Sequence, residues 1–199
     1  MLEKKILQKC YYDKKLSMVD TAKVLTVTPA MVAYWMRRYE FRRRSISEGV
    51  YVKQNPNGDP FKIKGKLTAI ENELLLAGLM LYWAEGPRRN KHVIQLANLD
   101  QRMLVLFIKF LRVICGVKEE KLTLNIQLYR KFDKDRTKKY WSKLLNVSTR
   151  FISVNIHSDK RSKPEKQWSE YGIARIEVRN VKLKQWIDEQ LLMYISKWI

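Results

Sequence analysis

The sequence predicts an α+β protein in which three short N-terminal helices precede a larger domain of helices and strands. Two observations predict this fold class. Apolar residues recur at helical spacing through residues 1–40, and strict apolar–polar alternation marks several segments after residue 120. We expect a helical domain over residues 1–44, a linker over 45–68 and the larger domain over 69–199.

The composition indicates a folded protein with an anionic partner. The chain has 199 residues, a formal net charge of +20 and 46% hydrophobic residues. That apolar fraction excludes a disordered basic tail, which could not bury enough surface to fold. Nucleic acid is the commonest partner of so basic a protein. A ribosomal or membrane-surface protein is the alternative.

The cysteine and apolar patterns predict a cytoplasmic protein, associated with the nucleoid if its source is prokaryotic. Cys10 and Cys115 stand far apart, which indicates no disulfide framework. With His92 and His157 they form no zinc-ligand spacing. The longest apolar run, residues 74–84, is about half the ~20 residues of a membrane span, so we expect no membrane partner.

Capping signals delimit the three expected N-terminal helices. The first covers residues 1–13, with inward positions Leu2, Ile6 and Cys10. Ser17 can cap the second helix. Thr28 precedes Pro29 at the start of the third, where proline needs no N–H partner. The turn-forming cluster 55–60 suggests a hinge in the linker.

The third helix is expected to enter the major groove of double-stranded DNA as the recognition helix of a helix-turn-helix. Val32 and Met36 should pack inward. The residues left to contact DNA are Thr28, Ala30, Met31, Tyr34, Arg37 and Arg38. Arg42, Arg43 and Arg44 suit a flexible arm along phosphates or a minor groove. A partner-binding three-helix bundle is the alternative.

This segment resembles the helix-turn-helix domains of resolvases and sigma-factor-like regulators. It departs from them at Thr26, where the turn often has glycine.

The larger domain is expected to alternate helices with strands in the order α-β-α-β-α-β-β-α. Expected helices cover residues 71–85, 101–116, 134–146 and 181–199, and expected strands cover 91–98, 121–131, 151–158 and 172–179. We expect at least the last two strands to pair antiparallel.

One face of these strands carries side chains that can hydrogen-bond to bases and phosphates. The inward face of the second strand is Leu122, Leu124, Ile126 and Leu128. The outward residues expected to contact DNA are Thr123, Asn125, Gln127, Tyr129, Ser153, Asn155, His157, Arg175 and Arg179. Glu177 shares that face. A merely polar exterior is the alternative.

The apolar helix over residues 71–85 has two unusual positions. Glycine in a helix interior, as at Gly78, lowers the stability of the helix by about 1 kcal/mol relative to alanine. We expect glycine there where another backbone must come close. Glu85 stands at the C-terminal end, where the helix dipole disfavours an anion. A carboxylate in that place favours a bound cation such as Mg²⁺.

The run LAGLMLYWAEG over residues 76–86 resembles the signature helix of LAGLIDADG homing endonucleases, and the likeness covers roughly residues 70–199. The resemblance implies a LAGLIDADG-like domain with a curved antiparallel sheet over DNA. It makes Glu85 the catalytic acid that binds Mg²⁺. Gln95 and Lys91 are the candidates for the strand-edge glutamine or lysine often found near such sites. It places a homodimer interface at Ala77, Gly78, Leu81 and Ala84. The acid is usually Asp in that family, and here a helix separates the first two strands.

Two functions follow as expectations. The first is a sequence-specific, Mg²⁺-dependent DNA endonuclease of the homing type, or a descendant of one. The second is a non-catalytic transcriptional regulator on the same scaffold. Binding to structured RNA, as in maturases, is a third and weaker alternative.

Overall fold

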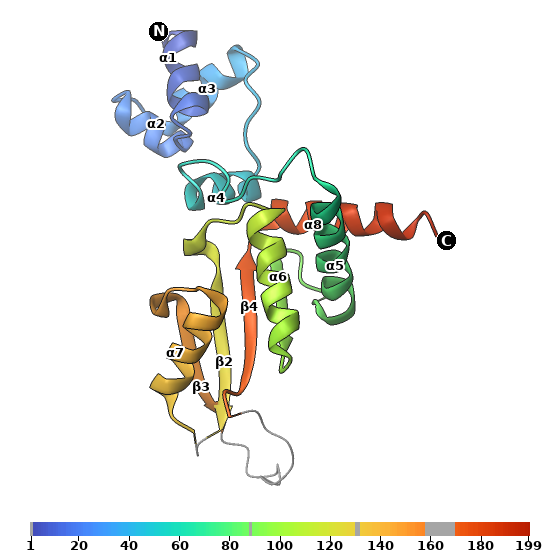
Figure 1. Ribbon diagram of the computed structural model, residues 1–199. Coiled ribbons are helices and arrows are strands. Elements are labelled where there is room, and N and C mark those ends of the chain that lie inside the picture. Colours follow the sequence, from blue (N-terminus) through green and yellow to red (C-terminus); the bar gives the residue numbers. More distant parts are fainter. Residues whose placement is uncertain (1, 88, 130–131, 158–169) are drawn as a thin grey trace. The chain divides into compact units, whose positions relative to one another are not determined.

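The computed structural model describes residues 2–87, 89–129, 132–157 and 170–199. The chain divides into two compact units, Met1–Asp59 and Pro60–Ile199. Within the described ranges it forms eight α-helices and one four-stranded sheet, so the predicted α+β class is confirmed (Figure 1). The boundary lies inside the stretch that was expected to be linker.

The first unit contains four α-helices. They are α1 (Lys4–Gln8), which continues into a π-helical turn over Lys9–Asp13, α2 (Met18–Val24), α3 (Pro29–Arg38) and α4 (Ile46–Gln54). The predicted Ser17 cap is confirmed, because its side chain accepts from the Asp20 N–H, and Thr28 caps α3 in the same way by accepting from the Met31 N–H. Pro29 occupies the first turn of α3.

The core of the first unit is small. It consists of Leu7, Tyr11, Ala22, Val32 and Met36. The expected inward position of Ile6 is wrong, because that side chain is 43% exposed while Leu7 is fully buried. The buried face of the first helix runs through Leu7, Cys10 and Tyr11, at the i, i+3, i+4 spacing of one helical face, so the predicted inward position of Cys10 is confirmed.

The linker expected over residues 45–68 is largely structured. Ser45 and Glu48 form a capping box that starts α4, with the Ser45 N–H donating to the Glu48 carboxylate at 2.7 Å. Further on, the backbone N–H of Lys62 donates to the Cys115 carbonyl at 3.1 Å, and that of Lys64 donates to Ile114 at 2.9 Å. The sequence did not predict α4 or these backbone hydrogen bonds, because polar and turn-forming residues in this stretch indicated a linker.

The second unit follows the predicted order of elements. They are α5 (Ala69–Glu85), β1 (Val93–Asn98), α6 (Gln101–Val113), β2 (Thr123–Tyr129), α7 (Lys134–Leu145), β3 (Ile152–His157), β4 (Ile173–Arg179) and α8 (Val181–Ile195). Short 3₁₀ turns over Glu119–Lys121 and Thr149–Phe151 precede β2 and β3.

The sheet is mixed, with strand order β1-β4-β2-β3. β4 pairs antiparallel with β1 and with β2, whereas β2 and β3 are parallel. The expectation of an all-antiparallel sheet, with β3 paired to β4, is therefore wrong. The helical crossover through α7 lets β3 run in the same direction as β2.

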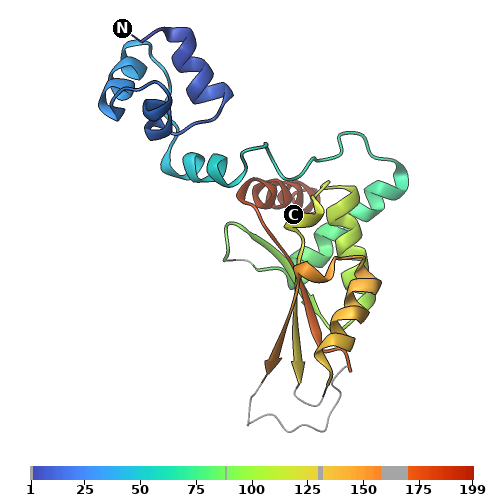
Figure 2. The ribbon, with the colours of Figure 1, turned by 90° about the vertical axis from the view of Figure 1, so that its left-hand side faces the viewer.

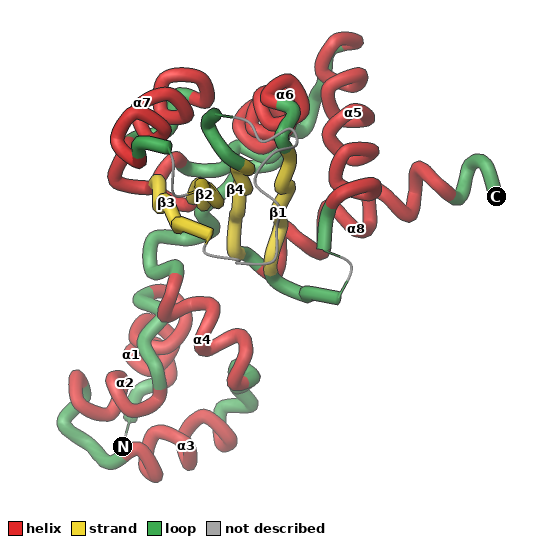
Figure 3. Tube along the Cα trace, turned by 90° about the horizontal axis from the view of Figure 1, so that it is seen from below, coloured by secondary structure: helices red, strands yellow, loops and turns green. Residues whose placement is uncertain are grey.

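Helices cover one face of the sheet. Figures 2 and 3 show α6 and α7 on the same side of the strands, with α5 next to α6. The core between them includes Phe107, Phe110, Trp141, Ile126 and Ile176, all at most 1% exposed. The alternating side chains of the strands then point to the opposite face.

Candidate nucleic-acid interface

The strand register brings the predicted polar residues into rows across the sheet. Arg175 of β4 lies opposite Ala97 of β1 and Asn125 of β2, and Asn125 lies opposite Ser153 of β3. In the next row toward the C-terminal end of β2, Gln127 lies between Ile173 and Asn155. We call the outward set the polar face: Gln95, Thr123, Asn125, Gln127, Ser153, Asn155, Arg175, Glu177 and Arg179.

The opposite side chains of the central strands form the core, as predicted. In β2 and β4 the inward residues Leu124, Ile126 and Ile176 are each 1% exposed. In β3 the alternation with Asn155 and His157 predicts an inward Ile156, but that side chain is 39% exposed, because β3 is an edge strand with a neighbour on one side only. The polar face is therefore anchored by two rigid central strands.

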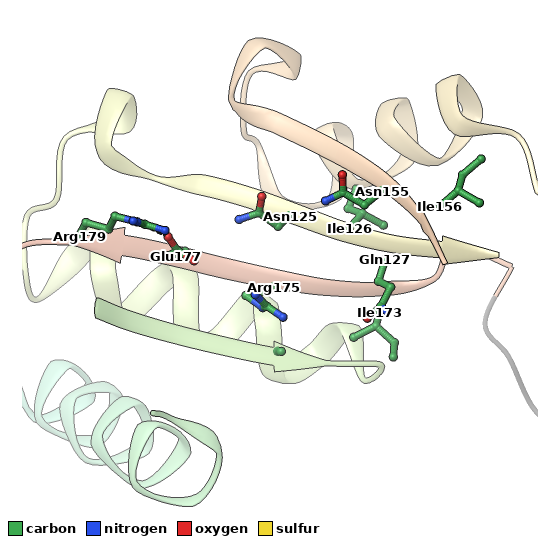
Figure 4. A pocket seen from close by; sticks show the side chains of 10 residues that line it. Asn125, Ile126, Gln127, Asn155, Ile156, Ile173, Arg175, Glu177 and Arg179 are labelled. Atoms are coloured by element: carbon green, nitrogen blue, oxygen red, sulfur yellow. Dashed lines mark hydrogen bonds and ion pairs between the residues drawn. The ribbon is translucent and has the colours of Figure 1, made fainter. Parts of the chain in front are cut away.

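Two hollows lie along the polar face. One, of about 420 Å³, is lined by carboxamide and guanidinium side chains that include Asn125, Gln127, Asn155 and Arg175 (Figure 4). The other, of about 380 Å³, is lined by Thr123 and Ser153 among others. These groups can donate and accept hydrogen bonds at a base edge or a phosphate.

Hydrogen bonds between side chains order the polar face. The Ser153 hydroxyl donates to Oδ1 of Asn125 at 2.5 Å. Nε of Arg179 donates to Oε1 of Glu177 at 2.5 Å. Glu177 is only 6% exposed, although the alternation predicted a solvent-facing residue.

Sequence reasoning missed Arg150. It lines the second hollow, and its guanidinium lies 4.5 Å from the ring centroid of Phe151. Both residues belong to the 3₁₀ turn before β3. The strand alternation carries no signal for a residue in such a turn.

Three predicted residues lie on the edge strand β1 or at the end of a strand. Gln95 of β1 is half-buried and pairs in register with Glu177, so it belongs to the polar face. The backbones of Tyr129 and His157 pair at the ends of β2 and β3. Their side chains lie outside the described part of the chain.

The predicted recognition helix α3 presents a mixed outer surface. Val32 and Met36 are fully buried, as predicted, while Met31 is 46% and Tyr34 51% exposed. The remaining predicted contacts that are exposed are Thr28, Ala30, Arg37 and Arg38. Thr26, in the turn before α3, has φ +54°, the left-handed conformation for which glycine is usual.

The basic arm of residues 42–44 is only partly as expected. Arg43 is exposed, and Arg42 is exposed but pairs with Glu48 at 2.7 Å. Arg44 does not belong to a flexible arm, because its guanidinium donates to the carbonyls of Tyr11, Lys15 and Leu16. It also lies 4.1 Å from the ring centroid of Tyr11, so Arg44 ties the end of the π-helical turn to the segment before α4.

Helix α5, which was expected to form a homodimer interface, packs at Gly78 against a helix of its own unit. A Cβ built on Gly78 would lie 2.2 Å from Cγ of Phe110 on α6, so the close approach is intramolecular and Gly78 is not free to meet a second copy. Of the other residues assigned to an interface, Ala77 and Leu81 are half-buried and Ala84 is exposed.

Glu85 ends α5 with an exposed carboxylate that has no hydrogen-bond or ion-pair partner among the described residues. Within those same ranges, no group of three His, Cys, Asp or Glu side chains could hold a metal ion. Mg²⁺ keeps several waters and is usually held by one or two carboxylates together with phosphates of the substrate. The described residues of this chain therefore do not make a magnesium site by themselves.

Comparison with known proteins does not place the chain in a family. No protein-family model, curated protein or solved structure matches it. Among the described helices none is long and apolar enough to cross a membrane. The function is therefore inferred from the residues and the charge of the chain.

Proposed function

We propose that the protein binds double-stranded DNA through the polar face of its sheet and through α3. One observation carries the proposal: Arg175, Asn125 and Ser153 lie in one row across neighbouring strands, with Gln127 and Asn155 in the next. Arginine and carboxamide side chains form the commonest direct hydrogen bonds to guanine and adenine in the major groove. Proteins that read DNA with β-sheets place strands in or along a groove.

The charge of the chain supports the same partner. A net charge of +20 on 199 residues attracts the phosphate backbone irrespective of sequence. The side chains of the polar face then supply the base-specific part, because DNA sequence is read by hydrogen bonds to base edges in the grooves.

The first unit supports a second contact. α3 has the small residue Ala30 in its first turn and exposes Met31, Tyr34 and Arg37. Small residues at the start of a recognition helix allow close approach to base edges, and arginines at its end reach phosphates. Two surfaces on one chain lengthen the DNA site that it can cover.

The test is binding of the purified chain to fluorescent duplex DNA at increasing salt. We expect submicromolar binding at low ionic strength, a steep loss of affinity with salt, and at least a tenfold loss in the double variant Asn125→Ala/Arg175→Ala. Lys109→Ala, on the exposed surface of α6, is the control with an equal loss of one charge. Failure of the wild-type chain to shift any duplex at low salt, or stronger binding to structured RNA, would overturn the proposal.

DNA cleavage is a second candidate, favoured by one observation. The unpartnered carboxylate of Glu85 lies at the C-terminal end of α5, where the helix dipole gives it no support. Because the described residues bring no three possible metal ligands together, magnesium would need further ligands from a second copy or from DNA phosphates. If no cleavage occurs, the same surfaces make a DNA-binding regulator.

Incubation with supercoiled DNA and Mg²⁺ distinguishes the two candidates. Nuclease activity should disappear in Glu85→Gln and persist in Glu73→Gln, which changes an exposed glutamate on the same helix. Cleavage that is equal in the two variants excludes a role for Glu85. Light scattering of the pure chain tests the homodimer that the nuclease would need.

A further inference from the structure

The polar face contains a single acidic side chain, and it is buried. Among the described residues of that face, all others are neutral or cationic, yet Glu177 lies in the middle of the central strand β4. Its side chain is 8% exposed. Gln95 and Thr123 flank it on the neighbouring strands. A carboxylate there repels phosphate, so it works against simple DNA attraction.

The carboxylate holds one edge of a guanidinium. Nε of Arg179 donates to Oε1 of Glu177 at 2.5 Å, and the two residues are two apart on the same face of β4 (Figure 4). The Arg179 side chain is nevertheless 70% exposed. Glu177 thus occupies the Nε edge, while the terminal Nη1 and Nη2 groups have no other partner among the described residues.

Stability gives only a weak reason for this pair. Solvent screens an ion pair whose arginine is largely exposed, so the pair contributes little to stability. Its effect on geometry is larger, since a free arginine samples many rotamers, whereas a guanidinium fixed at Nε presents its remaining donors in one direction. A planar fork with two outward donors matches O6 and N7 of guanine.

We propose that Glu177 is a positioning residue that holds Arg179 for the recognition of one guanine in the DNA site. The inference rests on the proposed DNA binding. It goes beyond that proposal because it assigns Arg179 to one guanine and assigns Glu177 to the orientation of Arg179. Arg179 makes the contact, and Glu177 acts through Arg179 without touching the DNA.

The experiment begins with selection of preferred duplexes from a random library by the wild-type chain. In the enriched sequence, one guanine should lose its preference when Arg179 is changed to Ala. Replacing that guanine by 7-deazaguanine removes the N7 acceptor and should weaken wild-type binding about tenfold. The same replacement should leave Arg179→Ala binding unchanged.

Variants of Glu177 then test positioning. Glu177→Ala should lose the preference for that guanine while its affinity for random duplex rises, because an anion has been removed. Glu177→Gln keeps an acceptor for Nε and should retain part of the preference. Glu189→Ala removes an exposed carboxylate on α8 and should keep the whole preference. Circular dichroism and melting temperature establish that each variant is folded.

Separate outcomes overturn separate claims. A wild-type chain that enriches no sequence and shifts no duplex removes the proposed DNA binding. Binding with an unchanged guanine preference in Glu177→Ala removes the positioning role alone. An equal loss of affinity for every sequence in Arg179→Ala makes Arg179 a phosphate contact and also overturns the inference.

Discussion

Gly78 of α5 lies directly against the ring of Phe110 of α6. A Cβ on residue 78 would be 2.2 Å from Cγ and 2.5 Å from Cδ2 of that ring. Phe110 is fully buried in the main core. The glycine therefore sets how closely the two helices pack within one chain, and its low helix propensity is offset by that packing.

Gly78→Ala is expected to lower the free energy of unfolding of the second unit by about 1–3 kcal/mol, because the new methyl group must displace a buried ring. Urea denaturation followed by tryptophan fluorescence measures the change. Gly65→Ala is the control, because a Cβ there meets nothing within 4 Å.

The double variant Gly78→Ala/Phe110→Leu gives a second check on this contact. Leucine leaves room where the ring was, so the two changes should destabilise by less than the sum of the single variants. Additive losses, or a Gly78→Ala variant as stable as Gly65→Ala, would contradict the proposed packing.

The sequence predicted the faces of the strands but not their neighbours. Alternation in residues 122–129 identified which side chains are buried, because the period of two is a property of one strand. Pairing depends on contacts between strands distant in sequence. The parallel pairing of Leu124 with Ile152 and the place of β4 between β1 and β2 therefore had no local signal.

The candidate site shows the same limit at the level of side chains. Asn125 and Arg175 were predicted on one face, and the register brings them together. Glu177 follows the same alternation, yet it is buried because Arg179 pairs with it. Arg43 and Arg44 are identical in sequence terms, and only tertiary contacts distinguish them.

α4 was missed because Gly49 interrupts it and its apolar residues do not gather on one helical face.

Thr26→Gly is expected to stabilise the first unit by about 0.5–1 kcal/mol. Thr26 has φ +54°, which is sterically costly for a β-branched residue, and part of the relief is offset by the greater freedom of glycine in the unfolded chain. Amide hydrogen exchange across residues 18–38 of the full chain measures the change. Lys23→Gly, at an exposed position inside α2, should act in the opposite direction by about 1 kcal/mol. Faster exchange in Thr26→Gly would contradict the expectation.

Acid should weaken the start of α6 in a defined pH range. The Asp100 side chain accepts from the N–H of Arg102 at 2.9 Å and from its guanidinium, chiefly Nη2 at 2.8 Å. The side-chain hydrogen bond from Arg102 is the main reason why the pKa of Asp100 is lowered to about 2. A lowered folded-state pKa stabilises the fold above the ordinary value of about 4, and this contribution is lost as the pH falls from there through about 2.

Asp100→Ser separates this effect from general acid unfolding. Serine can also cap a helix but does not titrate in this range. Hydrogen exchange of residues 100–106 should depend on pH more strongly in the wild-type chain than in the variant below about pH 4. Equal pH dependence of the two chains would show that Asp100 does not couple protonation to helix stability.

Arg43 and Arg44 are neighbours with different expected roles. Arg43 is exposed and has no partner among the described residues, so Arg43→Ala should leave stability unchanged, weaken DNA binding and reduce the salt slope by about 1. Arg44 donates to the carbonyls of Lys15 and Leu16 at 3.2 and 3.3 Å and to that of Tyr11. Arg44→Ala should therefore destabilise the first unit by about 1–3 kcal/mol, because these partly buried carbonyls lose their donor.

Hydrogen exchange over residues 4–38 and DNA binding, measured on the same preparations, distinguish the two roles. We expect faster exchange only in Arg44→Ala, and a loss of affinity without faster exchange only in Arg43→Ala. If Arg44→Ala exchanged like the wild-type chain but bound DNA as weakly as Arg43→Ala, its guanidinium would have to leave the three carbonyls when DNA binds. The segment would then be a phosphate-binding arm after all, because an arginine held in the fold cannot reach a phosphate at the same time.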